Sequence, residues 1–272
     1  MSCVELRKVT LEVGGKCYLQ EADLTVQAGE TVVIAGLPEA GKSFVPRLLL
    51  GLPGMDNDEV SLQGEVLVAE ANVAALSTLD LQALRRCIGT VMRDGGLIEN
   101  MDIRANVMLP LTYHYRDLLG AEKIQARCAA VLADLQLGHL AASGMRPVAL
   151  TRHERIYVSL ARALVTEPFL LLLDEPCVGL SPGAAQRLCE FIFNYQPVFE
   201  EPLPNHTGDR SAGLTRIATT VDFGAYLNFA DRFVLMWNGK LENLGDRSAV
   251  LTSSDPRVHK LLNPEIAEVA VG

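Results

Sequence analysis

The segment GLPEAGKS, residues 36–43, constrains the fold most, because it fits the pattern GxxxxGK[ST] of a phosphate-binding loop. An apolar run, TVVIA at 31–35, precedes this loop, and a helix-like segment at 44–50 follows it. A loop between a strand and a helix presents backbone N–H groups to phosphates, and the positive end of the helix adds to the attraction. The segment therefore predicts a nucleotide-binding α/β fold; the alternative is a chance match in a glycine-containing turn.

Each residue of the loop has an expected role. The two glycines allow close approach of the backbone to phosphate, Lys42 is expected to reach the β- and γ-phosphates, and the Ser43 hydroxyl is expected to hold Mg²⁺. The predicted nucleotide-binding residues are Gly36, Leu37, Pro38, Glu39, Ala40, Gly41, Lys42, Ser43 and Phe44.

A second motif, FLLLLDEP, occupies residues 169–176. Five apolar residues before Asp174 are typical of a central parallel strand, and such strands place their ligand-binding groups at the carboxyl end. We therefore expect Asp174 to bind the same Mg²⁺ as Ser43, and Glu175 to be the catalytic carboxylate that polarises the attacking water. The alternative is an acidic pair that caps the following turn.

Composition limits the class of protein. The chain has 272 residues, 49% of them hydrophobic, which is enough for a full core. Its net charge of −9 argues against a nucleic-acid partner, and no apolar run approaches the roughly 18 residues of a membrane span. The six cysteines show no CxxC or metal-ligand spacing, so reduced thiols in a cytosolic protein are expected. They are Cys3, Cys17, Cys87, Cys128, Cys177 and Cys189.

Hydrophobic patterns predict the order of the elements. Residues 4–13 and 19–26 are β-like around a turn at Gly14 and Gly15, and 59–70 read as an antiparallel flap. Helices are expected at 79–86, 121–135 and 186–194, with a helix-rich insert from about 80 to 165. An exposed loop is expected at 196–213, strands at 216–220, 232–237 and 240–244, and a short amphipathic tail after 254.

The order of these motifs resembles that of ATP-binding-cassette (ABC) ATPases, from about residue 4 to 263. SLARALVTEP at 159–168 is similar to the helix after the family's signature, GLSP at 179–182 to its GLDP motif, and ADR at 230–232 with NGK at 238–240 to its closing stretch. The resemblance implies an α/β P-loop NTPase with a mixed core sheet, an antiparallel β flap and a helical subdomain. It implies an ATPase domain at 1–254, with the helical subdomain at about 80–165, and a tail at 255–272.

Two segments are most similar to the ATPases of mammalian-cell-entry (MCE) lipid transporters of bacterial envelopes: GGLIENMDIRANVMLPL at 95–111 and DPRVHKLLN at 255–263. The resemblance implies a peripheral subunit on the cytoplasmic face of the inner membrane that uses ATP and Mg²⁺ in phospholipid transport. Its implied partners are an integral-membrane permease, received by the insert around 93–111, a second ABC ATPase subunit, an MCE protein and a small regulatory subunit.

The sequence departs from the family in the segment that aligns with its LSGGQ signature. Here it reads Leu150, Thr151, Arg152, His153 and Glu154. Thr151 keeps a hydroxyl, whereas Arg152 and His153 place side chains where the backbone of one subunit must approach the γ-phosphate bound by the other. An arginine in compensation is the alternative.

Four further positions differ from the family. Arg93 replaces the metal-sensing glutamine, Val221 the switch histidine, Ser181 the aspartate of GLDP, and Val13 the aromatic that stacks on adenine, with Tyr18 nearby in another register. We therefore expect an ABC-type ATPase that binds MgATP through intact Walker A and B motifs but hydrolyses it weakly or with a partner's help. The alternative is a non-catalytic regulatory or scaffold subunit. A soluble ABC protein of translation or DNA maintenance and a P-loop kinase fit the sequence less well.

Overall fold

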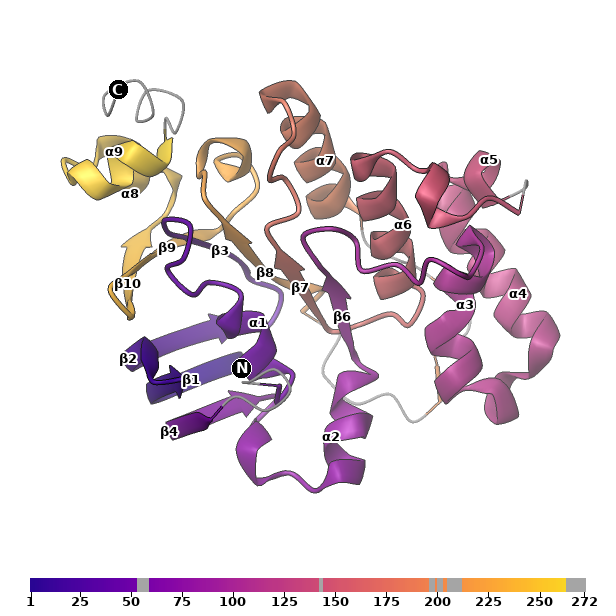
Figure 1. The fold of residues 1–272 in the computed structure, drawn as a ribbon, viewed down its shortest axis with the longest axis horizontal. Helices are drawn as coiled ribbons and strands as arrows, with labels where there is room; N and C mark the ends of the chain where they lie inside the picture. The colour runs from indigo at the N-terminus through magenta and orange to yellow at the C-terminus, as the bar shows by residue number, and fades with distance from the viewer. Residues whose placement is uncertain (53–58, 142–143, 196–198, 200–202, 205–211, 263–272) are drawn as a thin grey trace.

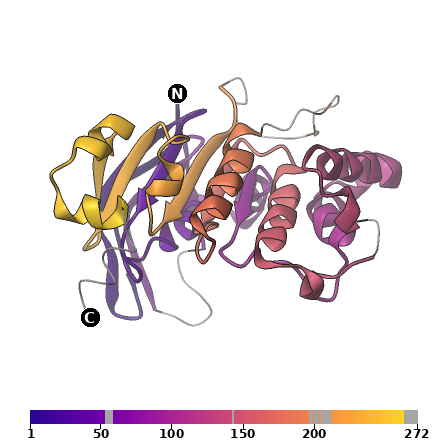
Figure 2. The same ribbon diagram turned by 90° about the horizontal axis from the view of Figure 1, so that it is seen from above.

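The computed structural model describes residues 1–52, 59–141, 144–195, 199, 203–204 and 212–262. The described residues form two sheets and a group of helices (Figure 1). Both views place the antiparallel sheet and the helical group at opposite ends, with the larger sheet between them (Figures 1 and 2).

The antiparallel sheet has the order β2-β1-β4-β5. Its strands are β1 (Ser2–Val13), β2 (Lys16–Gln27), β4 (Val60–Val68) and β5 (Ala71–Asn72). The first two form a hairpin whose turn uses positive φ angles at Gly14 and Gly15 (57° and 76°), which glycine adopts without steric cost. The predicted hairpin and antiparallel flap are confirmed.

The larger sheet has the order β10-β9-β3-β8-β7-β6, with only β10 antiparallel to its neighbour. Its strands are β3 (Thr31–Ala35), β6 (Ile88–Val91), β7 (Leu170–Asp174), β8 (Thr215–Thr220), β9 (Arg232–Trp237) and β10 (Lys240–Gly245). The central strands are buried on both faces, as their continuous apolar sequences predict. In β7, Leu170 and Leu172 join the core beneath the antiparallel sheet, whereas Leu171 and Leu173 join the core beneath the helices.

The helices cover this sheet and extend beyond its β6 edge. They are α1 (Phe44–Leu49), α2 (Thr78–Arg85), α3 (Ile103–His114), α4 (Arg116–Asp134), α5 (Gly138–Ala141), α6 (Arg152–Leu164), α7 (Pro182–Asn194), α8 (Arg247–Thr252) and α9 (Pro256–Leu262), with 3₁₀ turns at Val73–Ala75, Pro147–Ala149 and Gly224–Tyr226. Helix α3 packs on α4 and α6, and the three share one core with the sheet. Within the described residues, no helix is long and apolar enough to cross a membrane.

Two predicted boundaries differ from the structure. The stretch 80–165 is rich in helix but also contains β6, which pairs with β7 and belongs to the core sheet. The helix predicted at 121–135 is confirmed, because a break in helical geometry at Gly120 (φ 73°) separates this part of α4 from the turn that begins at Arg116. The helix predicted at 186–194 begins earlier, at Pro182, where proline suits the first turn. Most of the loop predicted at 196–213 lies outside the described residues.

Candidate nucleotide-binding site

The phosphate-binding loop connects β3 to α1 at the carboxyl end of the sheet. Gly36 is required by packing, because a Cβ there would lie 2.5 Å from the Met236 carbonyl oxygen. Gly41 has φ 89°, and a Cβ there would lie 2.6 Å from Tyr18 Cδ1. The two glycines thus fix the path of the loop as well as leaving its backbone uncovered.

The loop has the donors that a phosphate chain needs. In the described part of the chain, the N–H groups of Gly41, Lys42 and Ser43 donate to no other protein group. Pro38 and Glu39 are exposed at the tip, whereas Leu37 and Ala40 are half-buried, and Ala40 N–H donates to the Leu37 carbonyl (3.1 Å). This donor set fits an anionic phosphate group.

The predicted Mg²⁺ residues lie together although 131 positions separate them in sequence. Ser43 Oγ donates to Asp174 Oδ1 at 2.9 Å, and Thr219 Oγ1 from β8 donates to the same oxygen at 2.8 Å. A hydroxyl and a carboxylate oxygen side by side are the hard oxygen ligands that Mg²⁺ accepts. Thr219 is a member of the site that motif matching missed, and its only signal is its position at the end of a buried strand.

Glu175 is held by two cations. Its Oε1 lies 3.0 Å from Lys42 Nζ, its Oε2 lies 3.6 Å from Arg93 Nη1, and its side chain is only 9% exposed. Lys42, 3% exposed, also donates to the Leu37 carbonyl (2.7 Å). The alternative in which the acids cap the following turn is not what the structure shows, since their carboxylates contact Ser43, Thr219, Lys42 and Arg93.

The backbone at Glu175 is in the left-handed region, with φ 48°. This conformation is uncommon outside glycine and asparagine and occurs often at functional sites. The Glu175 N–H holds it in place by donating to the Thr219 carbonyl and hydroxyl oxygens, each at 3.2 Å.

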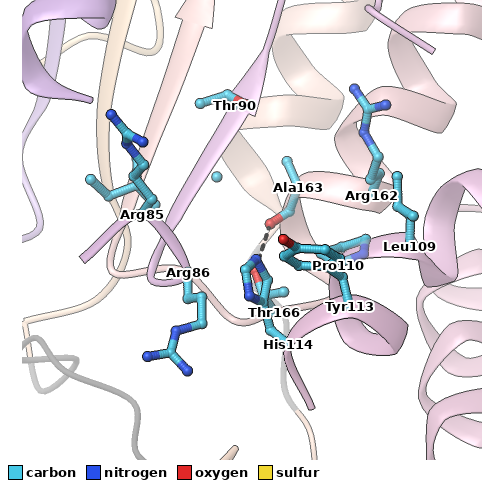
Figure 3. A pocket seen from close by; sticks show the side chains of 12 residues that line it. Arg85, Arg86, Thr90, Leu109, Pro110, Tyr113, His114, Arg162, Ala163 and Thr166 are labelled. Carbon is cyan, nitrogen blue, oxygen red and sulfur yellow. Dashed lines mark hydrogen bonds between the residues drawn. The ribbon is translucent and has the colours of Figure 1, made fainter. Parts of the chain in front are cut away.

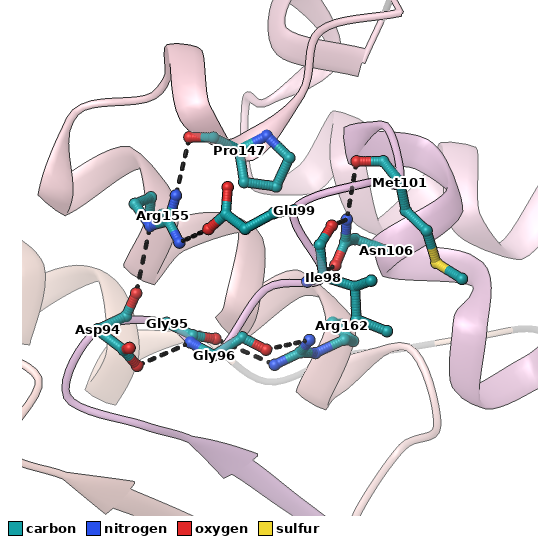
Figure 4. A network of polar contacts seen from close by, with 10 residues as sticks. All are labelled: Asp94, Gly95, Gly96, Ile98, Glu99, Met101, Asn106, Pro147, Arg155 and Arg162. Atoms are coloured by element: carbon teal, nitrogen blue, oxygen red, sulfur yellow. Dashed lines mark hydrogen bonds and ion pairs between the residues drawn. The ribbon is translucent and has the colours of Figure 1, made fainter.

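Helix α6 fixes the segment that carries Arg93 (Figure 4). Arg162 donates to the carbonyls of Gly95 (3.0 Å) and Gly96 (2.8 Å), and Arg155 donates to the Asp94 carbonyl (3.3 Å) and pairs with Glu99. The fully buried Asn106 closes the segment from α3, exchanging hydrogen bonds with the backbone of Ile98 (2.8 and 3.0 Å). The Arg93 side chain itself is 61% exposed.

The predicted signature segment forms the N-terminus of α6. Thr151 and Glu154 form a capping box: the Thr151 N–H and hydroxyl both donate to Glu154 Oε2, at 2.7 and 2.5 Å. These hydrogen bonds, from the hydroxyl first, lower the pKa of Glu154. Arg152 reaches back to donate to the Arg93 carbonyl (3.0 Å), and His153 Nε2 lies 3.4 Å from Thr151 Oγ1. The Thr151 N–H, the Thr151 hydroxyl and the Arg152 guanidinium are therefore used within the chain.

The adenine side differs from the alignment. Val13 is buried in the antiparallel sheet, whereas Tyr18 packs on Phe44 at a ring-centroid distance of 4.2 Å, with Lys16 Nζ 5.0 Å from its centroid. A cavity of about 290 Å³ adjoins Tyr18, between the phosphate-binding loop and the β9–β10 turn. Tyr18 and Trp237 are thus aromatic side chains that line this cavity, and Val13 does not line it.

The remaining two substituted positions lie at the rim of the site. Ser181 is exposed and precedes the first residue of α7, and Val221 is half-buried directly after β8. Both therefore stand on turns that follow the site strands, where the resemblance places them.

Fold and site together define a P-loop ATPase with an antiparallel sheet and a helical subdomain. Residues 19–178 match the family described as ABC transporter, so the chain belongs to this family. It is 30% identical over 236 residues to the methionine import ATP-binding protein MetN of Caulobacter vibrioides, covering 87% of the chain and 64% of that protein. It is 27% identical over 261 residues to the intermembrane phospholipid transport system ATP-binding protein MlaF of Escherichia coli K12, covering 96% and 88%.

Two solved structures share the fold. The protein cbiO1 of Clostridium perfringens, part of the ABC transporter complex cbiONQ, superposes with a TM-score of 0.75 at 21% identity, covering 100% of the chain and 99% of that structure. The ATP-binding cassette MJ0796, a dimer bound to ADP and Pi, superposes with a TM-score of 0.70 at 26% identity, covering 88% and 96%. ABC cassettes bind ATP with Mg²⁺, and this chain has the residues for both.

The chain spans 64%, 54% and 62% of the lengths of MetN, the spermidine/putrescine protein PotA of Methylococcus capsulatus and the Fe(3+) protein FbpC of Pseudomonas fluorescens. Several transport systems thus match at similar identity. The matches establish the ABC transporter family, and they do not single out lipid transport.

Proposed function

We propose that this chain is the nucleotide-binding subunit of a membrane transporter, peripheral to the cytoplasmic face of the membrane, and that it hydrolyses ATP weakly unless a partner changes its site. The observation that carries the proposal is the position of Glu175 between Lys42 and Arg93 (3.0 and 3.6 Å). A general base must orient the attacking water and accept its proton, and here both carboxylate oxygens of Glu175 are engaged by cations instead.

In this proposal, separate residues of the site bind the phosphates, bind Mg²⁺ and face the attacking water. Lys42 and the loop N–H groups hold the phosphates, and Ser43 with Asp174 holds Mg²⁺, which when bound offsets charge on the phosphate oxygens. Lys42 must leave Glu175 to contact phosphate. The Arg93 contact remains, and it keeps Glu175 from orienting the attacking water.

The test of nucleotide binding is calorimetric titration of the purified chain with ATP and Mg²⁺. Lys42→Ala removes the buried ammonium, and charge-assisted hydrogen bonds contribute about 1.5–3 kcal/mol, so affinity should fall about 10- to 100-fold. Lys260→Ala, at an exposed position of α9, is the matched control and should bind as the unaltered chain does. Unchanged affinity in Lys42→Ala would refute the proposal.

We further propose phospholipid as the cargo class, with an MCE-type partner complex. The support is the alignment with MlaF, which extends over 88% of that protein, together with the similar segments at 95–111 and 255–263. Reconstituted with its membrane subunits, the complex should move labelled phospholipid between vesicles in an ATP-dependent way. Uptake of methionine or spermidine with no lipid movement would contradict this cargo.

The docking surface that we propose for the membrane subunit is a cavity of about 340 Å³ between β6, α2, α3 and α6 (Figure 3). Arg86, Tyr113 and His114 line its mouth, and the Tyr113 side chain is largely exposed. Burial and the nearby Arg86 lower the pKa of His114. An amphipathic segment with an acidic side chain would suit this partly apolar, basic cavity.

A non-catalytic scaffold role is the second candidate function. It is favoured by the same Arg93–Glu175 contact, because hydrolysis would stay blocked if no partner separates these two side chains. Glu175→Gln in the assembled transporter distinguishes the two. A nucleotide-driven subunit should lose transport by at least about 100-fold, as when one electrostatic group is removed from a reaction site. A scaffold should be unaffected.

A further inference from the structure

Two cysteines that lie 12 positions apart in sequence meet beside the catalytic turn. Cys177 follows Glu175 by two residues, and Cys189 lies on the buried face of α7. Their sulfur atoms are 3.5 Å apart, close to van der Waals contact. The spacing gave no signal of a pair, because it matches no CxxC or metal-binding pattern.

The two thiols differ in exposure. Cys189 is fully buried, whereas Cys177 is half-buried and open to a small oxidant. Cys177 is also oriented by the Ala185 carbonyl, 3.8 Å from its sulfur. A partly exposed thiol beside a buried one has the arrangement of a reacting and a resolving cysteine.

The surroundings favour Cys177 as the thiolate. Its pKa is lowered, first by the hydrogen bond with Cys189 and then by the hydroxyl of Tyr226, although burial and Asp222 oppose this. The pKa of Cys189 is raised by the same thiol pair and by burial. Tyr226 is fully buried, and burial and the two thiols raise its pKa, so its hydroxyl stays neutral beside them.

We propose that Cys177 and Cys189 are a peroxide-sensitive dithiol that forms a reversible intramolecular disulfide. The Cys177 thiolate attacks hydrogen peroxide and the O–O bond breaks, giving a sulfenic acid and hydroxide, and the hydroxide takes up the proton that the Cys177 thiol released to become water. The Cys189 sulfur then attacks the Cys177 sulfur, the S–O bond breaks, and the Cys189 proton leaves with hydroxide as a second water. Two thiols and one peroxide thus give one disulfide and two waters.

The disulfide affects the catalytic turn directly. The sulfur atoms must approach from 3.5 Å to about 2.05 Å, which ties residue 177 covalently to α7. Because Glu175 and Ser181 lie on the same turn, oxidation restricts the segment that holds the catalytic carboxylate. The phosphate-binding loop is on another strand, so ATP binding should persist.

The test is peptide mapping of the purified, reduced chain after treatment with hydrogen peroxide. Arg187 lies between the two cysteines, so trypsin places them on separate peptides that remain joined only if the disulfide forms. We expect the joined peptides in non-reducing conditions and their separation by dithiothreitol. Cys177→Ser and Cys189→Ala should each abolish the joined species, and Cys17→Ser, at an exposed cysteine, should not.

Oxidation of Cys177 to sulfinic acid without the joined peptides, or linkage of Cys177 to any other cysteine, would overturn the proposal. Retention of ATP affinity after oxidation verifies that the oxidised chain is folded. This readout does not depend on hydrolysis, so failure of the dithiol and failure of the transporter function are distinguishable.

Discussion

At the scale of single residues, the contact between Arg93 and Glu175 is the one that the proposal of weak hydrolysis depends on. Lys42, Ser43, Asp174 and Glu175 all converge as the two motifs predicted. The sequence could not show that Arg93 reaches Glu175, because that distance depends on how α6 holds the segment after β6.

Arg93→Gln should raise ATP turnover by about tenfold or more, since removing the cation frees Glu175 to act as a base. Steady-state phosphate release by the chain with its partners measures it. Arg247→Gln, at an exposed arginine of α8 that lies in neither the nucleotide site nor the cavity, is the control and should leave turnover unchanged. If turnover stays low in Arg93→Gln while ATP still binds, the Arg93 contact is not what limits hydrolysis.

Tyr18→Ala should weaken ATP binding by about 1–3 kcal/mol, the range for loss of one aromatic–base stack. Val13→Ala, at the position that the alignment favoured, should change ATP affinity much less. Titration of both variants with a fluorescent nucleotide measures the two affinities. A larger loss of affinity in Val13→Ala than in Tyr18→Ala would show that position 13, and not Tyr18, contacts adenine.

At the scale of elements, the hydrophobic periodicity of the sequence predicted most strands and helices, but it could not show where the pairing between two strands shifts register. The β1–β2 pairing contains irregularities at four places, so residue offsets along the alignment do not give positions in space. For this reason Tyr18, not Val13, lies beside the loop. Similarly, the residues that align with the family signature form a capping box. The T-x-x-E pattern of this capping box is visible in the sequence, but the family alignment gave the same residues another interpretation.

Glu154→Gln should lower the free energy of unfolding by roughly 0.5–1 kcal/mol at pH 7, a modest effect because the helix start is exposed. The pKa of Glu154 is depressed in the folded state, so its contribution is present above the unfolded pKa and is lost as pH falls through the folded pKa. Urea unfolding at pH 7 and at lower pH should show the difference between variant and unaltered chain shrinking. A difference that is independent of pH would contradict this assignment.

At the scale of the whole molecule, the nucleotide site and the cavity beside α3 are joined by β6. Arg93 and its neighbours continue directly from this strand, and Thr90 lies at the cavity (Figure 3). A partner that fills the cavity therefore contacts the element whose end carries Arg93.

Tyr113→Asp should weaken binding of the membrane subunit by at least about 30-fold, since central aromatic side chains of interfaces often contribute 2 kcal/mol or more. Val148→Asp, an equally exposed apolar position outside the cavity, is the matched control. Affinity for the solubilised permease measures both. Equal weakening by the two variants would place the interface elsewhere.

The hydrogen bond between Arg152 and the Arg93 carbonyl connects two residues that both differ from the family pattern. A neighbouring subunit that tilts the start of α6 would act on the backbone at Arg93 through the hydrogen bond that the Arg152 guanidinium donates to its carbonyl at 3.0 Å. Communication between subunits would then run through a helix end instead of through a bound phosphate. Because the Arg152 guanidinium contacts the backbone carbonyl at position 93, replacing the Arg93 side chain would keep this hydrogen bond while freeing Glu175 for ATP hydrolysis.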